Sequence, residues 1–487
     1  MSVDTNNAEF QDALNLIQYT RQSVFLTGKA GTGKSTFLRY VCEHTKKKHV
    51  VLAPTGIAAI NAGGSTMHSF FKLPFYPLLP DDPNLSLQRG RIHEFFKYTK
   101  PHRKLLEQIE LVIIDEISMV RADIIDAIDR ILRVYSHNLR EPFGGKQLLL
   151  VGDVFQLEPV VKNDEREILN RFYPTPYFFS ARVFGQIDLV SIELQKVYRQ
   201  TDPVFVSVLD HIRTNTAGAA DLQLLNTRYG SQIEESEADM YITLATRRDT
   251  VDSINEKKLA ELPGEPITFE GVIEGDFPES SLPTSQELVL KPGAQIIFIK
   301  NDFDRRWVNG TIGVIAGIDE EEETIYVITD DGKECDVKLE SWRNIRYHYN
   351  EKTKEIEEEV LGSFTQYPIR LAWAITVHKS QGLTFSRVVI DFTGGVFAGG
   401  QAYVALSRCT SLDGIQLKKP INRADVFVRP EIVNFAGRFN NRQAIDKALK
   451  QAQADVQYAA ASRAFDKGDM EECLEQFFRA IHIYNCS

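Results

Sequence analysis

The sequence contains one short glycine-rich segment whose residue types and spacing suit a nucleoside triphosphate. Residues 28–35 read Gly-Lys-Ala-Gly-Thr-Gly-Lys-Ser. In this pattern the backbone N–H groups curl around the β-phosphate, Lys34 reaches the β- and γ-phosphates, and the Ser35 hydroxyl faces Mg²⁺. An apolar run at 24–27 predicts a strand before the loop, and residues 36–41 predict a helix after it. The expected cofactors are ATP and Mg²⁺, with cofactor contacts from Gly28, Ala30, Gly31, Thr32, Gly33, Lys34, Ser35 and Thr36.

A pair of acids extends this chemistry from nucleotide binding to hydrolysis. The aliphatic run 111–114 ends in Asp115 and Glu116. Strands of a doubly covered parallel sheet read as continuous aliphatic runs, and their carboxyl ends form the ligand crevice. We therefore expect Asp115 to share the metal ion with Ser35 and Glu116 to polarise the attacking water.

Two further aliphatic runs end in polar or glycine-rich loops. Residues 147–151 lead to Gln156, which could sense the γ-phosphate or orient the water, although an ordinary turn is an equal alternative. Residues 50–53 lead to Thr55 and Gly56, where a backbone could pass closely over a phosphodiester. Four such strands within about 130 residues predict a nucleotide-binding α/β domain.

Composition sets the broader class of protein. The chain has 487 residues, 43% of them apolar and 25% charged, which at roughly 150 residues per domain predicts three to four soluble units. No signal peptide or membrane span is recognisable, so we expect an intracellular protein, cytoplasmic (bacterial nucleoid) or nuclear, with no membrane partner. Five scattered cysteines without a C-x-x-C pair indicate reduced thiols and argue against a zinc site.

Charge is distributed unevenly along the chain. The net charge of −11 argues against a protein that coats polyanions generally. Residues 89–104, however, mix basic side chains with Phe95, Phe96 and Tyr98. That mixture suits single-stranded nucleic acid, through phosphate pairing and base stacking, and a solvated amphipathic helix is the equal alternative.

The second half holds further polar groups that could act on phosphates. His378, Lys379 and Ser380 are donors suited to a phosphate backbone. Arg408 ends a helix-like run, and an arginine aimed into a cleft from a separate lobe could stabilise charge on the transferring phosphoryl group. Alone, each is more often a core histidine or a surface charge.

Taken in order, the motifs resemble the superfamily 1 helicases. They are GxAGTGKS, PTGIAA, DEISM, GDxxQL, YRQ, TVHKSQG and YVALSR, and residues 66–71 and 142–147 resemble the PIF (petite integration frequency) family of DNA helicases in particular. The resemblance covers roughly residues 20–430. It implies two RecA-like lobes with ATP between them and 5′→3′ translocation on single-stranded DNA, with duplex or forked DNA as substrates and roles in DNA repair, recombination and telomere maintenance.

The same resemblance implies roles for individual residues. Catalytic positions are Glu116, Lys34, Gln156, Arg199 and Arg408; Gln381 and Gly382 join the cofactor site; Ser35 and Asp115 hold the metal; DNA contacts fall to Thr55, Gly56, His68, Thr376, His378 and Lys379. Two departures stand out. Glu158 replaces a proline that is usual in the third motif, and the adenine contact is open between Gln11 and Gln18.

The predicted fold class is α/β: two RecA-like parallel-sheet lobes with an inserted wedge, an inserted SH3-like β-barrel and a C-terminal helical segment. The domains are expected at 1–200 (first lobe, insertion 65–105), 201–290 with 366–435 (second lobe), 291–365 (barrel) and 436–487 (helices). The last segment resembles one tetratricopeptide repeat, which cannot bury its own face and so should pack on the second lobe, continue in a longer chain or bind a protein partner. A plain amphipathic hairpin is the alternative.

Two rival functions share this nucleotide site. One is an ATP-driven switch that needs no DNA, and the other is a translocase on RNA or a hybrid, because contacts to the 2′-hydroxyl cannot be read from sequence. For a DNA helicase, the proline-rich stretch near 72–83 is predicted to project from the first lobe as a wedge at the duplex junction, with the barrel capping the channel.

Overall fold

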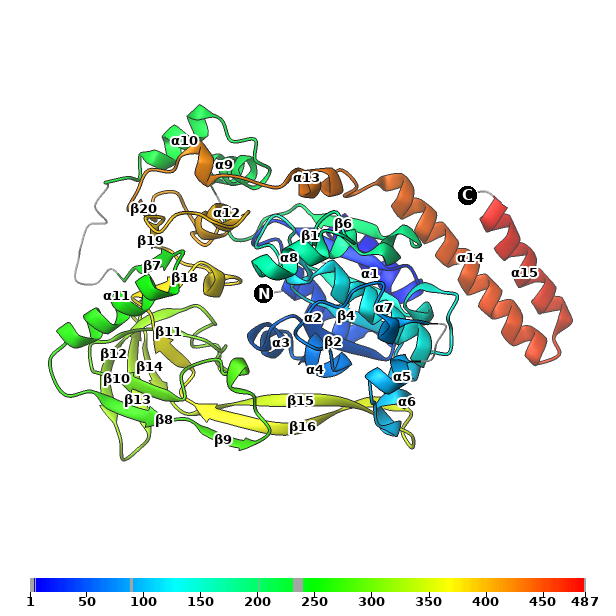
Figure 1. Ribbon diagram of the computed structural model, residues 1–487, viewed down its shortest axis with the longest axis horizontal. Coiled ribbons are helices and arrows are strands. Elements are labelled where there is room, and N and C mark those ends of the chain that lie inside the picture. Colours follow the sequence, from blue (N-terminus) through cyan, green and yellow to red (C-terminus); the bar gives the residue numbers. More distant parts are fainter. Residues whose placement is uncertain (1–3, 5, 88–90, 201, 231–239, 486–487) are drawn as a thin grey trace.

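The first lobe is built around a six-stranded parallel sheet in the order β3-β2-β4-β5-β1-β6 (Figure 1). The structure is a computed structural model and describes all residues except 1–3, 5, 88–90, 201, 231–239 and 486–487. The strands are aliphatic because both faces of the sheet are covered. They are β1 (Val24–Gly28), β2 (His49–Ala53), β3 (Ser65–Thr66), β4 (Leu111–Ile114), β5 (Gln147–Val151) and β6 (Val190–Leu194).

Helices on each face of this sheet complete two apolar cores. One core packs α1 and α2 against the sheet, and the larger one lies beneath α4, α6 and α7. The carboxyl ends of β1, β2, β4 and β5 meet at one edge, as the sequence predicts. The helices are α1 (Ala8–Tyr19), α2 (Lys34–His44), α3 (Gly56–Ala62), α4 (Met67–Phe71), α5 (Ile92–Phe95), α6 (Lys100–Gln108), α7 (Ala122–Tyr135) and α8 (Asn163–Leu169).

The second lobe has a smaller parallel sheet in the order β18-β7-β19-β20. The predicted two-lobe α/β fold is therefore confirmed. The strands are β7 (Ile242–Ala245), β18 (Ala374–Thr376), β19 (Val388–Asp391) and β20 (Ile415–Leu417). The helices are α9 (Pro203–Arg213), α10 (Ala219–Asn226), α11 (Arg248–Glu261), α12 (Gln401–Leu406) and α13 (Pro430–Ala436).

The residues predicted as one barrel at 291–365 are divided between two antiparallel sheets. Five strands follow the order β14-β13-β12-β11-β17, and a separate sheet has the order β15-β16-β9. A further pair, β8 and β10, lies before residue 291. The strands are β8 (Ile267–Glu270), β9 (Val272–Gly275), β10 (Glu287–Leu290), β11 (Gln295–Phe298), β12 (Ile312–Asp319), β13 (Thr324–Thr329), β14 (Glu334–Val337), β15 (Glu340–Asn350), β16 (Glu355–Gln366) and β17 (Ile369–Leu371).

The β15–β16 hairpin explains why the predicted boundaries differ. These two strands are 11 and 12 residues long, whereas the other accessory strands have three to eight residues. The hairpin therefore runs out of its own domain and along the first lobe (Figure 1). There Tyr347 joins the core of the first lobe and its ring meets Phe70 edge to face at 6.2 Å. The hairpin thus connects the accessory sheets to the first lobe.

The proline-rich part of the insertion at 65–105 is packed on the first lobe, which corrects the predicted stiff projection; its role as a wedge stays a prediction. Leu73, Leu78 and Leu85 of its proline-rich part are buried in the core of the first lobe. Arg130 of α7 also donates to the Pro80 carbonyl at 2.7 Å. Its exposed residues include an aromatic tip, Phe75 at 84% and Tyr76 at 53% exposure. These two residues are the candidates for a wedge at the duplex junction.

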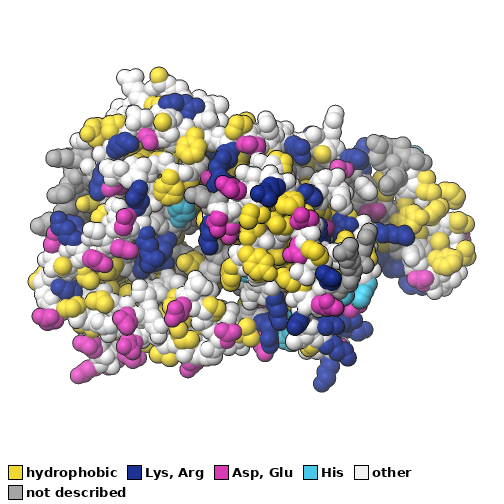
Figure 2. Space-filling view, in the orientation of Figure 1, with side chains coloured by type: hydrophobic (Ala, Val, Ile, Leu, Met, Phe, Trp, Pro, Cys, Tyr) yellow, Lys and Arg dark blue, Asp and Glu magenta, His cyan; other side chains and the backbone are white. Residues whose placement is uncertain are grey.

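The C-terminal segment forms a helical hairpin of α14 (Arg442–Asp466) and α15 (Met470–Asn485). Ile445 and Ala448 of α14 pack in the core that α1 shares with the first sheet, and Arg442 pairs with Asp12. The hairpin therefore lies on the first lobe. The prediction that it packs on the second lobe is wrong. Its far end stands away from the body, with apolar side chains on the face shown in Figure 2. Among the described residues, no helix has the length and apolar character needed to cross a membrane.

Candidate active site

A cavity of about 750 Å³ opens at the carboxyl edge of the first sheet, where the second lobe faces it. Its size lies within the range of small-molecule sites. Most of the predicted nucleotide-binding residues meet in its wall, whereas Gly28 and Gln381 stand behind the lining. The lining residues from the predicted set are Ala30, Gly31, Thr32, Gly33, Lys34, Ser35, Thr36, Asp115, Glu116, Gln156, Arg199, Gly382 and Arg408.

The loop between β1 and α2 has the geometry of a phosphate cradle. Gly31 and Gly33 adopt φ angles of 81° and 90°, which glycine reaches without strain. A Cβ on Gly31 would lie 2.4 Å from the Arg199 Cβ, so glycine also lets the Arg199 segment approach the loop. The Lys34 ammonium donates to the Gly28 carbonyl at 2.7 Å and the Lys29 carbonyl at 3.1 Å. It thus sits inside the loop with carbonyl partners that a phosphate can replace.

Two acids follow β4 at the floor of the cavity. The Glu116 N–H donates to Asp115 Oδ1 at 2.9 Å, and Glu116 has a φ of 50°, a left-handed conformation that is uncommon outside glycine. Burial raises the pKa of Glu116 to about 7, with a further contribution from Asp115. Burial also raises the pKa of Asp115. Because burial disfavours the charged forms of both acids, a metal ion bound beside them would stabilise their carboxylates.

The donor set at this floor fits Mg²⁺. Ser35 and Asp115 line the same cavity, one supplying a hydroxyl and the other a carboxylate oxygen. Mg²⁺ prefers oxygen ligands and usually combines one or two protein groups with phosphate and water oxygens. These two residues would therefore hold the ion together with the nucleotide.

Two arginines bring positive charge to the opposite wall. Arg408 is 1% exposed and donates hydrogen bonds to oxygen atoms of the second lobe, among them the Val404 carbonyl at 2.9 Å. Arg199 donates to the Ser407 and Gly382 carbonyls at 3.3 Å each. Burial lowers the pKa of Arg408 to about 9, with a further contribution from the nearby charge of Arg199, and burial also lowers the pKa of Arg199. Such incompletely compensated cations favour a polyanion in the space between them.

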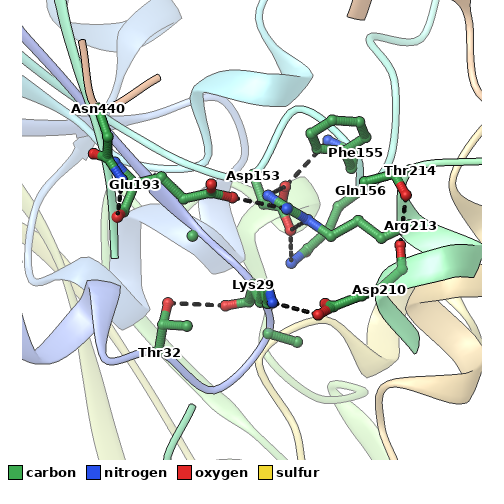
Figure 3. Close-up of polar contacts among 12 residues, drawn as sticks. Lys29, Thr32, Asp153, Phe155, Gln156, Glu193, Asp210, Arg213, Thr214 and Asn440 are labelled. Atoms are coloured by element: carbon green, nitrogen blue, oxygen red, sulfur yellow. Dashed lines mark hydrogen bonds and ion pairs between the residues drawn. The ribbon is translucent and has the colours of Figure 1, made fainter. Parts of the chain in front are cut away.

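The loop after β5 joins the two lobes through Gln156. Its amide oxygen accepts from Gln381 at 3.4 Å, which places Gln381 behind the cavity rather than in its lining. Its own amide nitrogen reaches Asp153 Oδ2 at 3.4 Å. Figure 3 shows that Asp153 in turn faces Arg213 of α9. Gln156 is therefore held from both sides, as suits a group that senses phosphate.

Neither glutamine proposed for the adenine contact lines the cavity. The cavity lining near α1 comes instead from Asn7 and Phe10, together with Tyr198. Asn7 caps α1 by accepting from the Phe10 N–H at 2.9 Å, and Tyr198 donates its N–H to the Gly31 carbonyl at 2.9 Å. Gln11 and Gln18 lie about one and three turns beyond Asn7 along α1. Sequence reasoning missed these lining residues because they come from a helix start and from a distant loop.

Sequence reasoning also missed a tyrosine that joins the lobes. The Tyr403 hydroxyl of α12 accepts from the Ala30 N–H of the phosphate loop at 3.0 Å. Burial raises the pKa of Tyr403, so its phenol is neutral at ordinary pH. The motif that supplied Arg408 contained Tyr403, but an aromatic residue inside a helix-like run reads as core.

The residues predicted to contact DNA lie on both lobes outside this cavity. Thr55 caps α3 by accepting from the Ala58 N–H at 3.2 Å, and Thr376 accepts from the Lys379 N–H at 3.2 Å in the turn that begins the short helix His378–Ser380. Two of the side chains stack on aromatic rings: His68 on Phe75, with centroids 5.0 Å apart, and His378 on Phe397 at 6.4 Å. A Cβ on Gly56 would collide with Ser281, so this glycine serves a close contact with the accessory region.

Comparison with known proteins identifies the family of the chain. The family model described as PIF1-like helicase matches residues 5–215. An ATP-dependent DNA helicase Pif1 of Campylobacter jejuni is 34% identical over 412 residues, which cover 81% of this chain and 88% of the relative. The chain belongs to the PIF1-like helicase family.

Solved structures of the family agree with this assignment. A Bacteroides Pif1 in complex with ADP-AlF4 matches with a TM-score of 0.81 and 42% identity, covering 88% of this chain and 96% of that one. A Bacteroides Pif1 bound to single-stranded DNA matches with a TM-score of 0.64 and 41% identity, covering 91% and 99%. The lobes and accessory sheets described above are thus those of a PIF1-like helicase.

The departure at Glu158 from the expected family pattern has a structural explanation. Glu158 accepts from Arg429 at 2.7 Å and from the Tyr177 hydroxyl at 2.9 Å. Arg429 directly precedes α13. The carboxylate therefore fastens the segment that returns from the second lobe, which a proline could not do.

The basic segment at 89–104 serves the core as well as the surface. Phe96, Tyr98 and His102 are buried in or against the core of the first lobe, so stacking on bases is wrong for Phe96 and Tyr98. Lys97, Lys100 and Arg103 are exposed, and Arg89 lies outside the described residues. Lys and Arg side chains also gather along the lower edge of the face in Figure 2, near α5 and α6. What remains of the prediction is a basic surface in which the partly exposed Phe95 is the candidate for stacking on bases.

Proposed function

We propose that this chain is an ATP-dependent DNA helicase that moves 5′→3′ along single-stranded DNA and unwinds duplex or forked DNA. The observation that carries the proposal is the cavity at the lobe interface, where Lys34 and Glu116 of the first lobe face Arg199 and Arg408. A site completed by a second lobe couples nucleotide state to lobe position. The helicase names of the relatives and the ADP-AlF4 and single-stranded DNA complexes support it.

Each residue has a distinct part in hydrolysis. Lys34 and the loop amides hold the β- and γ-phosphates, and Ser35 and Asp115 hold Mg²⁺, which neutralises phosphate oxygens when bound. Glu116 orients the attacking water and accepts its proton. Arg199 and Arg408 exchange their carbonyl partners for phosphate oxygens as the lobes close, and Gln156 reports the γ-phosphate to Gln381.

Closure of the lobes would also move DNA. Thr55 and His68 lie on the first lobe, and His378 and Lys379 on the second. Contacts from each set to the sugar–phosphate backbone carry no sequence information, as a motor requires. Closing on ATP would draw the two sets together by about one nucleotide, and release after hydrolysis would let one set advance. Activity in the bacterial nucleoid or the nucleus, and protein partners at α14–α15, stay predictions.

A strand-displacement assay tests the direction and the substrate together. Duplexes with a 5′ or a 3′ single-stranded tail are mixed with protein, ATP and Mg²⁺, and ATPase is measured with DNA, with RNA and with neither; Lys34→Ala is the inactive control. We expect unwinding of the 5′-tailed duplex only and stimulation by DNA. ATPase indifferent to nucleic acid would indicate a switch, and equal stimulation by RNA would indicate an RNA or hybrid translocase.

A further inference from the structure

Helix α9 of the second lobe inserts one buried arginine into the first lobe. Arg213 is 3% exposed and Asp153 is 1% exposed. The Arg213 guanidinium donates to Asp153 Oδ1 at 3.0 Å and to Oδ2 at 3.4 Å, and its third nitrogen donates to Glu193 Oε1 at 2.7 Å (Figure 3). Its plane also lies 4.3 Å from the Phe155 ring centroid. Arg213 thereby joins the ends of β5 and β6 to α9.

Asp153 organises the loop that carries Gln156. Its Oδ1 accepts from the Phe155 N–H at 3.2 Å, and its Oδ2 accepts from the Gln156 amide at 3.4 Å. Its carbonyl accepts from the Gln156 N–H at 3.0 Å. With Arg213 in place, every acceptor of this buried carboxylate is used. Without Arg213 the charge would be only partly paired, which is costly in a buried position.

One alternative partner for that carboxylate is the phosphate-binding lysine, Lys34. Asp153 and Lys34 line the same cavity. The hydrogen bonds of Lys34 go to carbonyl groups of its own loop. An Asp153 released by Arg213 could therefore pair with Lys34 and compete with phosphate.

We propose that Arg213 is a positioning residue for the nucleotide site: it holds the Asp153 carboxylate away from Lys34 and fixes the loop that carries Gln156. The same helix also reaches the phosphate loop, because Asp210, one turn earlier, pairs with Lys29. The position of α9 therefore determines how both Asp153 and Lys29 are paired. The inference rests on the proposed ATP site. It adds that a second-lobe residue, Arg213, sets the geometry of this site before ATP binds.

Nucleotide affinity measured with a fluorescent ATP analogue tests this role in the full chain. Arg213→Met should raise the Kd on the order of tenfold, because Asp153 then occupies Lys34. Adding Asp153→Asn in that background removes the competing charge and should restore most of the affinity. Arg213→Lys keeps a positive charge but cannot bind the carboxylates of both Asp153 and Glu193, so the Kd should rise by about threefold. Adding Asp153→Asn should again relieve this loss. The lysine series decides the question if the methionine variant does not fold.

Arg133→Met is the matched control for loss of a buried arginine. Arg133 is 6% exposed and bonded to Asp129 on α7, away from the cavity. This variant should lower the melting temperature without changing the Kd. Affinity like the parent's in both Arg213 variants, or a loss that Asp153→Asn does not relieve, would overturn the inference. Failure of the parent chain itself to bind ATP would instead count against the proposed function.

Discussion

The nucleotide cavity and the predicted DNA-contact residues differ in how the chain builds them. In the cavity, buried charges from both lobes converge, and their pKa values shift because they are removed from water. The DNA-contact residues are placed by local turns instead: Thr55 and Thr376 bond to backbone within three residues of themselves. A reaction needs converging buried groups, whereas a sliding contact needs repeated backbone contacts on rigid turns. Substitutions in the cavity should therefore change the rate of ATP hydrolysis, and substitutions on the turns should change the affinity for DNA.

The largest effect is expected where the cavity does chemistry. Glu116→Gln keeps the shape of the side chain but cannot take a proton from water, so turnover should fall by about 10²–10⁴-fold. ATP affinity should stay within a few-fold, because Lys34, Ser35 and Asp115 remain. Steady-state ATPase and nucleotide titration measure the two quantities. Normal turnover in this variant would remove Glu116 from its role.

The aromatic tip of the insertion should affect strand separation but not hydrolysis. Deleting the whole proline-rich stretch would remove the buried Leu78, so point changes are the cleaner test. Tyr76→Ala should reduce duplex unwinding several-fold and leave single-strand-stimulated ATPase unchanged, since Tyr76 does not line the cavity. Phe75 is kept in this variant because its ring stacks on His68, a predicted DNA contact. Leu139→Ala, a 50% exposed residue, is the control. Equal loss of both activities would show that the tip does not act at the junction.

A smaller change is expected from His378, a residue predicted to contact the DNA backbone. His378→Ala should weaken single-stranded DNA binding by a few-fold and to the same extent for all sequences, because phosphate contacts carry no base information. ATPase without DNA should not change. Fluorescence anisotropy with several oligonucleotides measures this. A defect confined to one sequence would mean that His378 contacts base edges.

How far the sequence predicted each region follows from the same contrast. The P-loop, Asp115 and Glu116 belong to short contiguous motifs at strand ends, so their place in the cavity followed from spacing. Arg213 and Tyr403 reach the site only through tertiary packing, and an arginine in an amphipathic helix has no sequence signal of its own. The barrel boundaries failed for a related reason: alternation predicts strands, but it does not say which sheet a long hairpin joins.

A separate effect, on stability rather than on activity, concerns His102, which lies under the β15–β16 hairpin. Burial, with help from Lys72, lowers the pKa of His102 to about 4, so the fold holds it neutral. Stability from this residue is present above the usual pKa of about 6.5 and is lost as pH falls from there to about 4. Between pH 7 and pH 5 the free energy of unfolding of the parent should fall by about 2 kcal/mol more than that of His102→Phe. Parallel denaturant midpoints for the two proteins would contradict this.

The most direct test of a site completed by both lobes is the DNA-stimulated ATPase of Arg408→Ala. The account predicts a loss of roughly 10³-fold in turnover at saturating ATP, with ATP and single-stranded DNA still bound. A melting curve shows whether the second lobe stays folded without the buried guanidinium. Turnover like the parent's in a folded Arg408→Ala protein would show that the first lobe hydrolyses ATP by itself and would contradict the account.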